Sequence, residues 1–66
     1  MVGAGEGVRR VVVVGTDAEA VGRTVRRLRD EGARVAGHVG RDEDSARAMG
    51  TEMLGGVDEV VYADEG

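Results

Sequence analysis

The turn at Gly15, Thr16 and Asp17 contains the residues of this chain best suited to bind an anion. It follows the valine run of residues 11–14 and precedes a segment with helical periodicity. A glycine permits a tight turn, and the first turn of a helix offers backbone N–H groups together with the positive end of the helix dipole. Gly22, further along the same helix, would let the helix lie close to the strand. These residues predict a site for the phosphate groups of a nucleotide.

Two carboxylates oppose this interpretation of the turn. Asp17 and Glu19 lie where the first helical turn is expected, and a carboxylate there repels a phosphate and occupies the N–H groups that would bind it. We therefore expect any binding of a nucleotide to be weak.

Two further loops should lie at the same edge of the sheet. In an open parallel sheet, ligands bind beyond the C-terminal ends of the strands, where the strand order reverses. Arg41 would lie near this point, where an arginine can contact a 2′-phosphate or simply be solvated. Asp17 and Asp64 could together ligate Mg²⁺ or Ca²⁺, but the helix dipole alone favours acids at helix N-termini. We adopt the second explanation and predict no metal site.

The sequence contains no recognisable catalytic group. His38 is expected on a strand without an acid or a nucleophile beside it in sequence, and Ser45 in the first turn of a helix, where it favours helix formation. Tyr62, the single aromatic residue, is expected to pack against a helix. The chain has no cysteine, which excludes disulfides and thiolate metal sites. We expect a protein without enzymatic activity of its own.

The first strand and helix follow from the residues around the glycine turn. An uninterrupted valine run predicts a strand over residues 8–14 that is buried on both faces, as in the centre of a parallel sheet. Thr16 and Glu19 form a capping box, so a helix should begin at about Asp17. Gly32 should end it at the C′ position. The apolar stripe of this helix is expected at Ala18, Val21, Val25 and Leu28.

The remaining elements repeat this alternation. A shorter and more mixed strand is predicted over residues 34–39, and Asp42 should cap a second helix. Gly55 and Gly56 should end that helix, and a third strand is predicted over residues 58–63. The buried face of the second helix is expected at Ala46, Met49, Gly50, Met53 and Leu54.

Together these elements predict an α/β fold with a small three-stranded parallel sheet in the order β-α-β-α-β, a Rossmann-like or flavodoxin-like half. Crossovers of this length are right-handed and make the strands parallel. A spatial order of 2-1-3 would put the valine strand in the middle with one helix on each face, whereas 3-2-1 would put both helices on one face. We favour 2-1-3. Residues 8–66 would form this single domain, after a glycine-rich flexible arm at residues 1–7.

Composition limits the partners that the protein can have. A formal net charge of −4 argues against nonspecific binding to nucleic acid, which needs a positive field. A solvated face without interleaved aromatic residues is expected for the arginines of the first helix, Arg23, Arg26, Arg27 and Arg29. The longest apolar run is too short to cross a membrane and no cleavable leader is recognisable, so we expect a soluble cytoplasmic protein.

The small size of the chain favours association. A domain of 66 residues is small, and such domains bury only about 60% of the surface that their unfolded chains expose. Without disulfides or a structural metal, the remaining routes to stability are very regular local structure and a partner. We expect a homo-oligomer that forms through exposed edges of the sheet.

The segments at residues 11–22, 23–32 and 41–56 resemble the dinucleotide-binding regulatory domains of potassium-uptake systems, the TrkA-N type. The shared features are the valines, the glycine turn, an arginine-rich helix and an Arg-Asp-Glu-Asp start to the second helix. The resemblance implies a Rossmann-like fold that binds NAD or NADP. This chain departs from the motif G-x-G-x-x-G, because Gly15 and Gly22 alone match it, and from the family's ribose-binding acid, whose position falls at glycine 40.

Two hypotheses of different classes follow. In the first, the protein is a minimal Rossmann-like binding module with a regulatory or accessory role, which holds a nucleotide loosely at Gly15, Thr16 and Asp17, with Gly22 and Arg41 assisting. In the second, it is a non-enzymatic interaction domain whose exposed sheet edges pair with a second copy.

Overall fold

The computed structural model describes residues 8–63. The segment predicted as a flexible arm, residues 1–7, lies outside the described residues, and so do Asp64 and Glu65. In chain order the elements are β1 (Arg10–Gly15), α1 (Ala18–Asp30), β2 (Arg34–Val39), α2 (Glu43–Met53), a short 3-10 helix η1 (Leu54–Gly56) and β3 (Glu59–Tyr62).

The three strands form one parallel sheet in the order β2-β1-β3, which confirms the predicted fold and strand order. β1 lies in the centre because its valines can be buried on both faces, and all four are at most 3% exposed. In the register, Val13 is opposite Gly37 of β2 and Val61 of β3.

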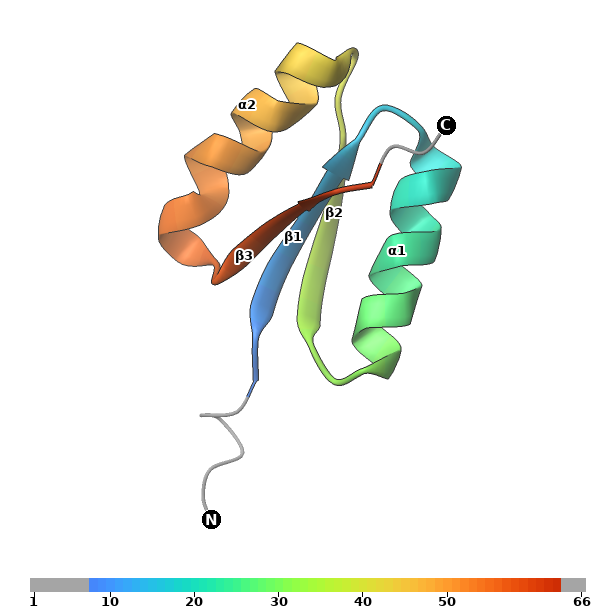
Figure 1. Ribbon diagram of the computed structural model, residues 1–66, viewed down its shortest axis with the longest axis vertical. Coiled ribbons are helices and arrows are strands. Elements are labelled where there is room, and N and C mark those ends of the chain that lie inside the picture. The colour runs from blue at the N-terminus through green and yellow to red at the C-terminus, as the bar shows by residue number, and fades with distance from the viewer. Residues whose placement is uncertain (1–7, 64–66) are drawn as a thin grey trace.

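The sheet lies between the two helices (Figure 1). α1 packs mainly on β2 and β1, where Val11, Val13, Val21 and Val35 form one buried cluster. On the other face, α2 packs on β1 and β3, and Val12, Val14 and Ala46 form a second buried cluster. The two helices are therefore displaced in opposite directions across the sheet, and each covers the central strand and one edge.

The start of α1 differs from the prediction by one residue. The N-cap is Asp17 and not Thr16, because the Asp17 carboxylate accepts a hydrogen bond from the Glu19 backbone N–H at 3.2 Å. The predicted stripe is confirmed at Val21, Val25 and Leu28, but Ala20, at 3% exposure, takes the place expected for the exposed Ala18. At the other end Gly32 has a φ of 99°, as expected for a glycine at C′.

α2 begins as predicted, but its last turn differs. Asp42 is the N-cap, and its carboxylate accepts a hydrogen bond from the Ser45 backbone N–H at 2.8 Å. Ala46 and Gly50 are buried, as expected. Leu54 was expected on the buried face but is 50% exposed, because the α-helix ends at Met53 and the chain turns through η1.

Glycines set how closely each helix approaches the sheet. A Cβ atom at Gly40 would lie 2.7 Å from the Ala46 nitrogen, and one at Gly50 would lie 2.6 Å from a Val60 methyl group, so α2 needs both glycines. A Cβ atom at Gly37 would lie 2.9 Å from a methyl group of Val21 on α1.

Gly22 does not have the role predicted for it. A Cβ atom at this position would meet no atom within 4 Å, so the close approach of α1 depends on Gly37 of the strand and not on the helical glycine. The prediction failed because the face of the helix that carries Gly22 does not lie against the sheet.

Neither α1 nor α2, the two α-helices within residues 8–63, combines the length and the apolar character that a membrane span requires.

Candidate functional site

The ends of the three strands meet at the C-terminal edge of the sheet, where the sequence placed the nucleotide site. The Gly40 backbone N–H donates to the Gly15 carbonyl at 2.8 Å, and the Ala63 N–H donates to the Val14 carbonyl at 2.7 Å. Gly15 is buried, Thr16 is half-buried and Asp17 is exposed. The predicted residues Gly15, Thr16 and Asp17 are consecutive at this edge.

The N-terminus of α1 already carries a negative group. The Asp17 carboxylate accepts the Glu19 N–H, which is one of the donors that a phosphate would need. A bound phosphate would have to displace this hydrogen bond and also lie beside the Asp17 charge. The Asp17 carboxylate thus opposes an anion at the first turn of α1, as expected from the sequence.

The second loop at this edge is shaped by packing. Gly40 stands where a dinucleotide fold would place a ribose-binding acid, and the first turn of α2 leaves no room there for a side chain. Arg41 follows it as an exposed residue. Hydrogen bonds from Ser45, first from its backbone and then from its side chain, hold the pKa of Asp42 below its ordinary value. Asp42 thus serves as the cap of α2.

A groove between α1 and β3 is the feature that reasoning from sequence missed. It has a volume of about 470 Å³. We call it the arginine groove, and its lining residues are Ala20, Arg23, Thr24, Arg26, Arg27, Asp30 and Ala63. The spacing of Arg23, Arg26 and Arg27 places them on one face of the helix. The groove forms because α1 is displaced toward β2, which leaves the end of β3 beside this arginine-bearing face.

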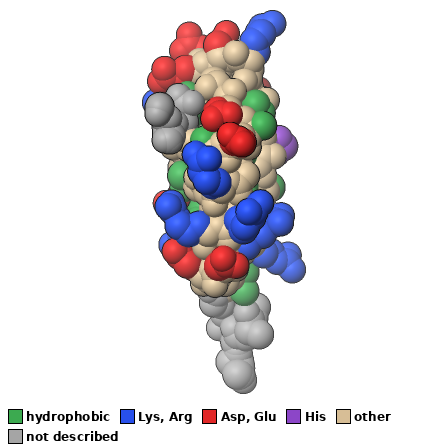
Figure 2. All heavy atoms as spheres, turned by 90° about the vertical axis from the view of Figure 1, so that its right-hand side faces the viewer, with side chains coloured by type: hydrophobic (Ala, Val, Ile, Leu, Met, Phe, Trp, Pro, Cys, Tyr) green, Lys and Arg blue, Asp and Glu red, His purple; other side chains and the backbone are tan. Residues whose placement is uncertain are grey.

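Four arginines have partners among residues 8–63, whereas the groove's arginines have no carboxylate partner there, and neither do the exposed Arg34 and Arg41. Arg9, Arg10 and Arg47 form ion pairs with Glu59, Asp58 and Glu43, at 3.4, 3.6 and 2.9 Å. Arg29 donates to the Val35 carbonyl at 2.9 Å. Within residues 8–63, by contrast, no carboxylate lies within ion-pair distance of the groove's three guanidinium groups. Figure 2 shows arginine side chains gathered over the middle of this side of the molecule, between acidic groups above and below.

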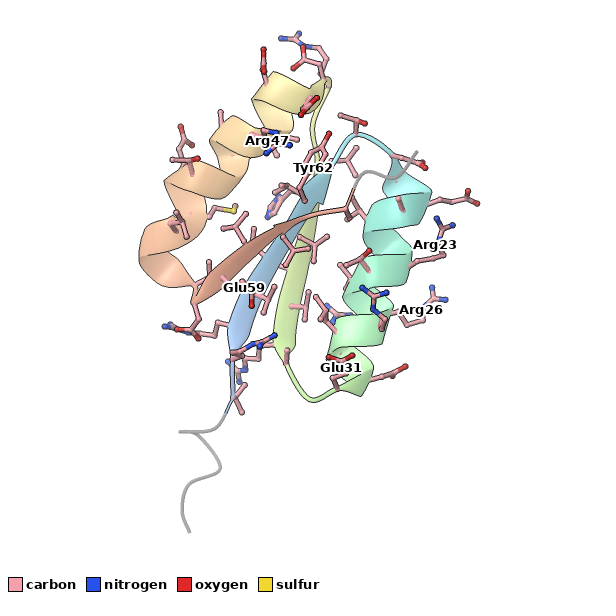
Figure 3. All side chains as sticks on the ribbon, in the orientation of Figure 1. Arg23, Arg26, Glu31, Arg47, Glu59 and Tyr62 are labelled. Carbon is pink, nitrogen blue, oxygen red and sulfur yellow. The ribbon has the colours of Figure 1, made fainter. Side chains whose placement is uncertain are left out.

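Tyr62 packs on the opposite face of the sheet, against α2. Its ring belongs to the cluster of Val12, Val14 and Ala46, and the Arg47 guanidinium lies 4.5 Å from the ring centroid. Figure 3 shows Arg47 of α2 beside Tyr62 of β3, and Arg47 also forms an ion pair with Glu43 at 2.9 Å. The expectation that Tyr62 packs against a helix is confirmed, and this contact gives it a structural role.

Acidic residues at the edge of the sheet do not form a metal centre within the described part of the chain. No group of three or more His, Cys, Asp or Glu residues among residues 8–63 could hold an ion. The predicted alternative that paired Asp17 with Asp64 falls partly outside these residues.

Comparisons of this chain with protein-family models, with curated proteins and with solved structures gave no match. The resemblance to the TrkA-N type consequently stays a prediction.

Proposed function

We propose that this protein is a non-enzymatic interaction module that associates through the open β3 edge of its sheet. The observation that carries this proposal is the composition of β3. Val60, Val61 and Tyr62 are consecutive, half-buried and β-branched or aromatic, on a strand that has only β1 as a neighbour within residues 8–63.

The position of the helices supports the same edge. On the α1 side, Val61 and Ala63 are only partly buried, because α1 lies over β2 and β1. Figure 1 shows β3 in front of the other strands, with its outer side open between α2 and α1. An added strand would cover these side chains and extend the sheet.

The other edge is less suited to pairing. β2 has Ala36 and Gly37 in its middle, which offer little side chain for cross-strand contacts and fix the register poorly. Its exposed apolar residue, Val39, stands at the end of the strand and is 49% exposed. This difference favours β3 as the edge at which association begins.

Sedimentation velocity over a wide range of concentration tests the proposal. The protein should change from a 6.9 kDa monomer to a dimer as its concentration rises. Val61→Lys should weaken association, since two lysines would meet at the centre of the paired strands, while its long aliphatic stem still covers the sheet.

Val39→Lys on β2 is the matched control and should leave association unchanged. Far-UV circular dichroism verifies that both variants are folded. A wild-type protein that stays monomeric at every concentration, or a loss of association in the Val39 variant alone, would contradict the proposal.

A second candidate is weak binding of a nucleotide, such as NAD or NADP, at Gly15, Thr16 and Asp17. It is favoured by the strand order β2-β1-β3, which puts this turn where the order reverses. Ligand panels read by melting temperature test it. Asp17→Asn keeps a capping oxygen and removes the charge, so this variant should respond more strongly than the wild type; a flat response from both at millimolar ligand would eliminate the candidate.

A further inference from the structure

We propose that the arginine groove receives Glu59 of a second copy of the chain, which antiparallel pairing of two β3 strands about a twofold axis would bring there. This inference rests on the association proposed above, and it adds the partner, the register and the residues that select them.

The register follows from the direction of the backbone groups of β3. The Ala63 N–H points to β1, where it donates to the Val14 carbonyl at 2.7 Å. Because backbone groups alternate along a strand, those of Val61 also point to β1 and those of Val60 point to the outer edge. In an antiparallel pair, residues whose backbone groups face the partner must lie opposite each other. Val60 and Tyr62 are such residues, and a register centred on Val61 places Val60 opposite the partner's Tyr62.

This register determines what meets on the α1 side of the sheet. Glu59, Val61 and Ala63 alternate onto that side, as the membership of Val61 and Ala63 in the α1 cluster shows. With Val61 facing the partner's Val61, Glu59 lies directly opposite the partner's Ala63. Ala63, which directly follows β3, also lines the arginine groove, so each glutamate reaches the groove of the other copy.

Charge complementarity makes this occupant suitable. The groove offers the guanidinium groups of Arg23, Arg26 and Arg27, which have no carboxylate within 4.0 Å among residues 8–63. Among residues 8–63, the ion-pair partner of Glu59 is Arg9, at 3.4 Å, and the two side chains are 47% and 55% exposed. An ion pair so open to water is weak, and Glu59 can exchange it for the groove at little cost.

Glu59 cannot reach the groove of its own chain. It stands at one end of β3, and the groove adjoins the other end of the strand, at Ala63. Figure 3 shows Glu59 at the far end of β3 from the part of the strand that approaches α1 near Arg23. The contact therefore requires a second molecule, and a twofold axis at Val61 satisfies both grooves at once and closes the assembly as a dimer.

A charge exchange between two variants tests this inference. Glu59→Arg should weaken the dimer about tenfold at low salt, because two arginines then enter grooves of the same charge. The double variant Arg23→Glu and Arg27→Glu should weaken it to a similar degree, because Glu59 then meets acids. An equimolar mixture should recover the wild-type affinity, since each variant complements the other at both contacts.

The matched control is Arg41→Glu, which reverses an exposed arginine outside the groove and should leave the dimer unchanged. Sedimentation velocity gives the affinities and far-UV circular dichroism verifies the folds. If a charge reversal prevents folding, Glu59→Gln and the pair Arg23→Gln and Arg27→Gln replace it, and each should still weaken the dimer at low salt.

The outcomes separate this inference from the proposed function. Weakened variants whose mixture recovers support it. A wild-type dimer that none of the reversals affects, or a mixture that does not recover, overturns the register and leaves association through β3 intact. A wild type that is monomeric at every concentration overturns both. If the charge exchange fails while millimolar inorganic phosphate raises the melting temperature of the wild type but not of the groove variant, the groove is a site for a free anion and the glutamate contact is wrong.

Discussion

The two faces of the sheet are covered in different ways. On one face α2 lies close to the strands, because Gly40 and Gly50 have no side chains, and Ala46 of this helix is fully buried. The charged residue that lines this contact, Arg47, has both Glu43 and the ring of Tyr62 as partners. Val60 and Tyr62 are half-buried on this face, but its arginine has partners within the chain.

The α1 face differs in the partners of its arginines. α1 approaches β2 at Gly37, but its displacement leaves Val61 and Ala63 partly exposed at the other edge. Its arginines Arg23 and Arg27 have no carboxylate in ion-pair distance within residues 8–63. This difference is consistent with the proposal that the α1 side provides the surface for a partner.

The largest effect should come from Gly40→Ala, which breaks the close α2 contact. The new Cβ atom would lie 2.7 Å from the Ala46 nitrogen, and a backbone atom cannot move aside as a side chain can. We expect a loss of about 2–3 kcal/mol in the free energy of unfolding, measured by urea denaturation. A loss below about 0.5 kcal/mol would show that α2 does not depend on this glycine.

A smaller loss is expected from Gly37→Ala on the α1 face. Here the Cβ atom would meet methyl groups of Val21 and Val25, at 2.9 and 3.0 Å, and side-chain ends can shift by part of an ångström. We expect a loss of about 1 kcal/mol in the same urea assay. If this variant is as unstable as Gly40→Ala, the two faces do not differ in how tightly they are packed.

Gly22→Ala should have the opposite sign. Position 22 is inside α1, and a Cβ atom there meets nothing within 4 Å. Replacing a helical glycine by alanine reduces the entropy lost on folding, so we expect a gain of about 0.5–1 kcal/mol. Gly22→Ala also serves as the matched control for Gly40→Ala. If Gly22→Ala lowers the free energy of unfolding, the position of α1 described above is wrong.

The smallest effect concerns the cap of α2 in acid. The lowered pKa of Asp42 means that its ionised form is favoured in the folded state, so its contribution is present above the pKa of the unfolded chain. This stability should be lost as the pH falls below about 4 and the carboxylate is protonated. Asp42→Asn keeps the capping oxygen without a titrating group.

Thermal melts of both proteins between neutral and acidic pH test this prediction. The difference in melting temperature that favours the wild type at neutral pH should shrink in acid. A constant difference across this range would mean that Asp42 does not act through its charge.

Much of the fold follows from local sequence. The four valines can be buried on both faces only in a central strand, so β1 had to lie between β2 and β3. The cap of α1 does not follow from the sequence, because Thr16 and Asp17 are adjacent and both can accept the hydrogen bond. In the structure Asp17 is the cap, with an extended backbone.

The site was harder to predict, because it depends on how elements lie against each other. Helical spacing places Arg23 and Arg27 on one face, but the sequence does not say that α1 is displaced toward β2. Nor does it say which glycine lies at the contact between α1 and the sheet, so the sequence points to Gly22 where Gly37 has that role. Distances between elements are set by packing of the whole sheet, and no local pattern records them.

Hydrogen exchange of individual amides tests the central claim, association through β3, most directly. The Ala63 and Gly40 N–H groups both donate to β1. Backbone groups alternate in direction along a strand, and Val60 and Gly37 each lie three residues before these donors, so their N–H groups point to the outer edges of β3 and β2. As the protein concentration rises through the dimerisation range, exchange at Val60 should slow while exchange at Gly37 stays constant. Slowing at Gly37 alone, or constant rates at both amides, would contradict the account.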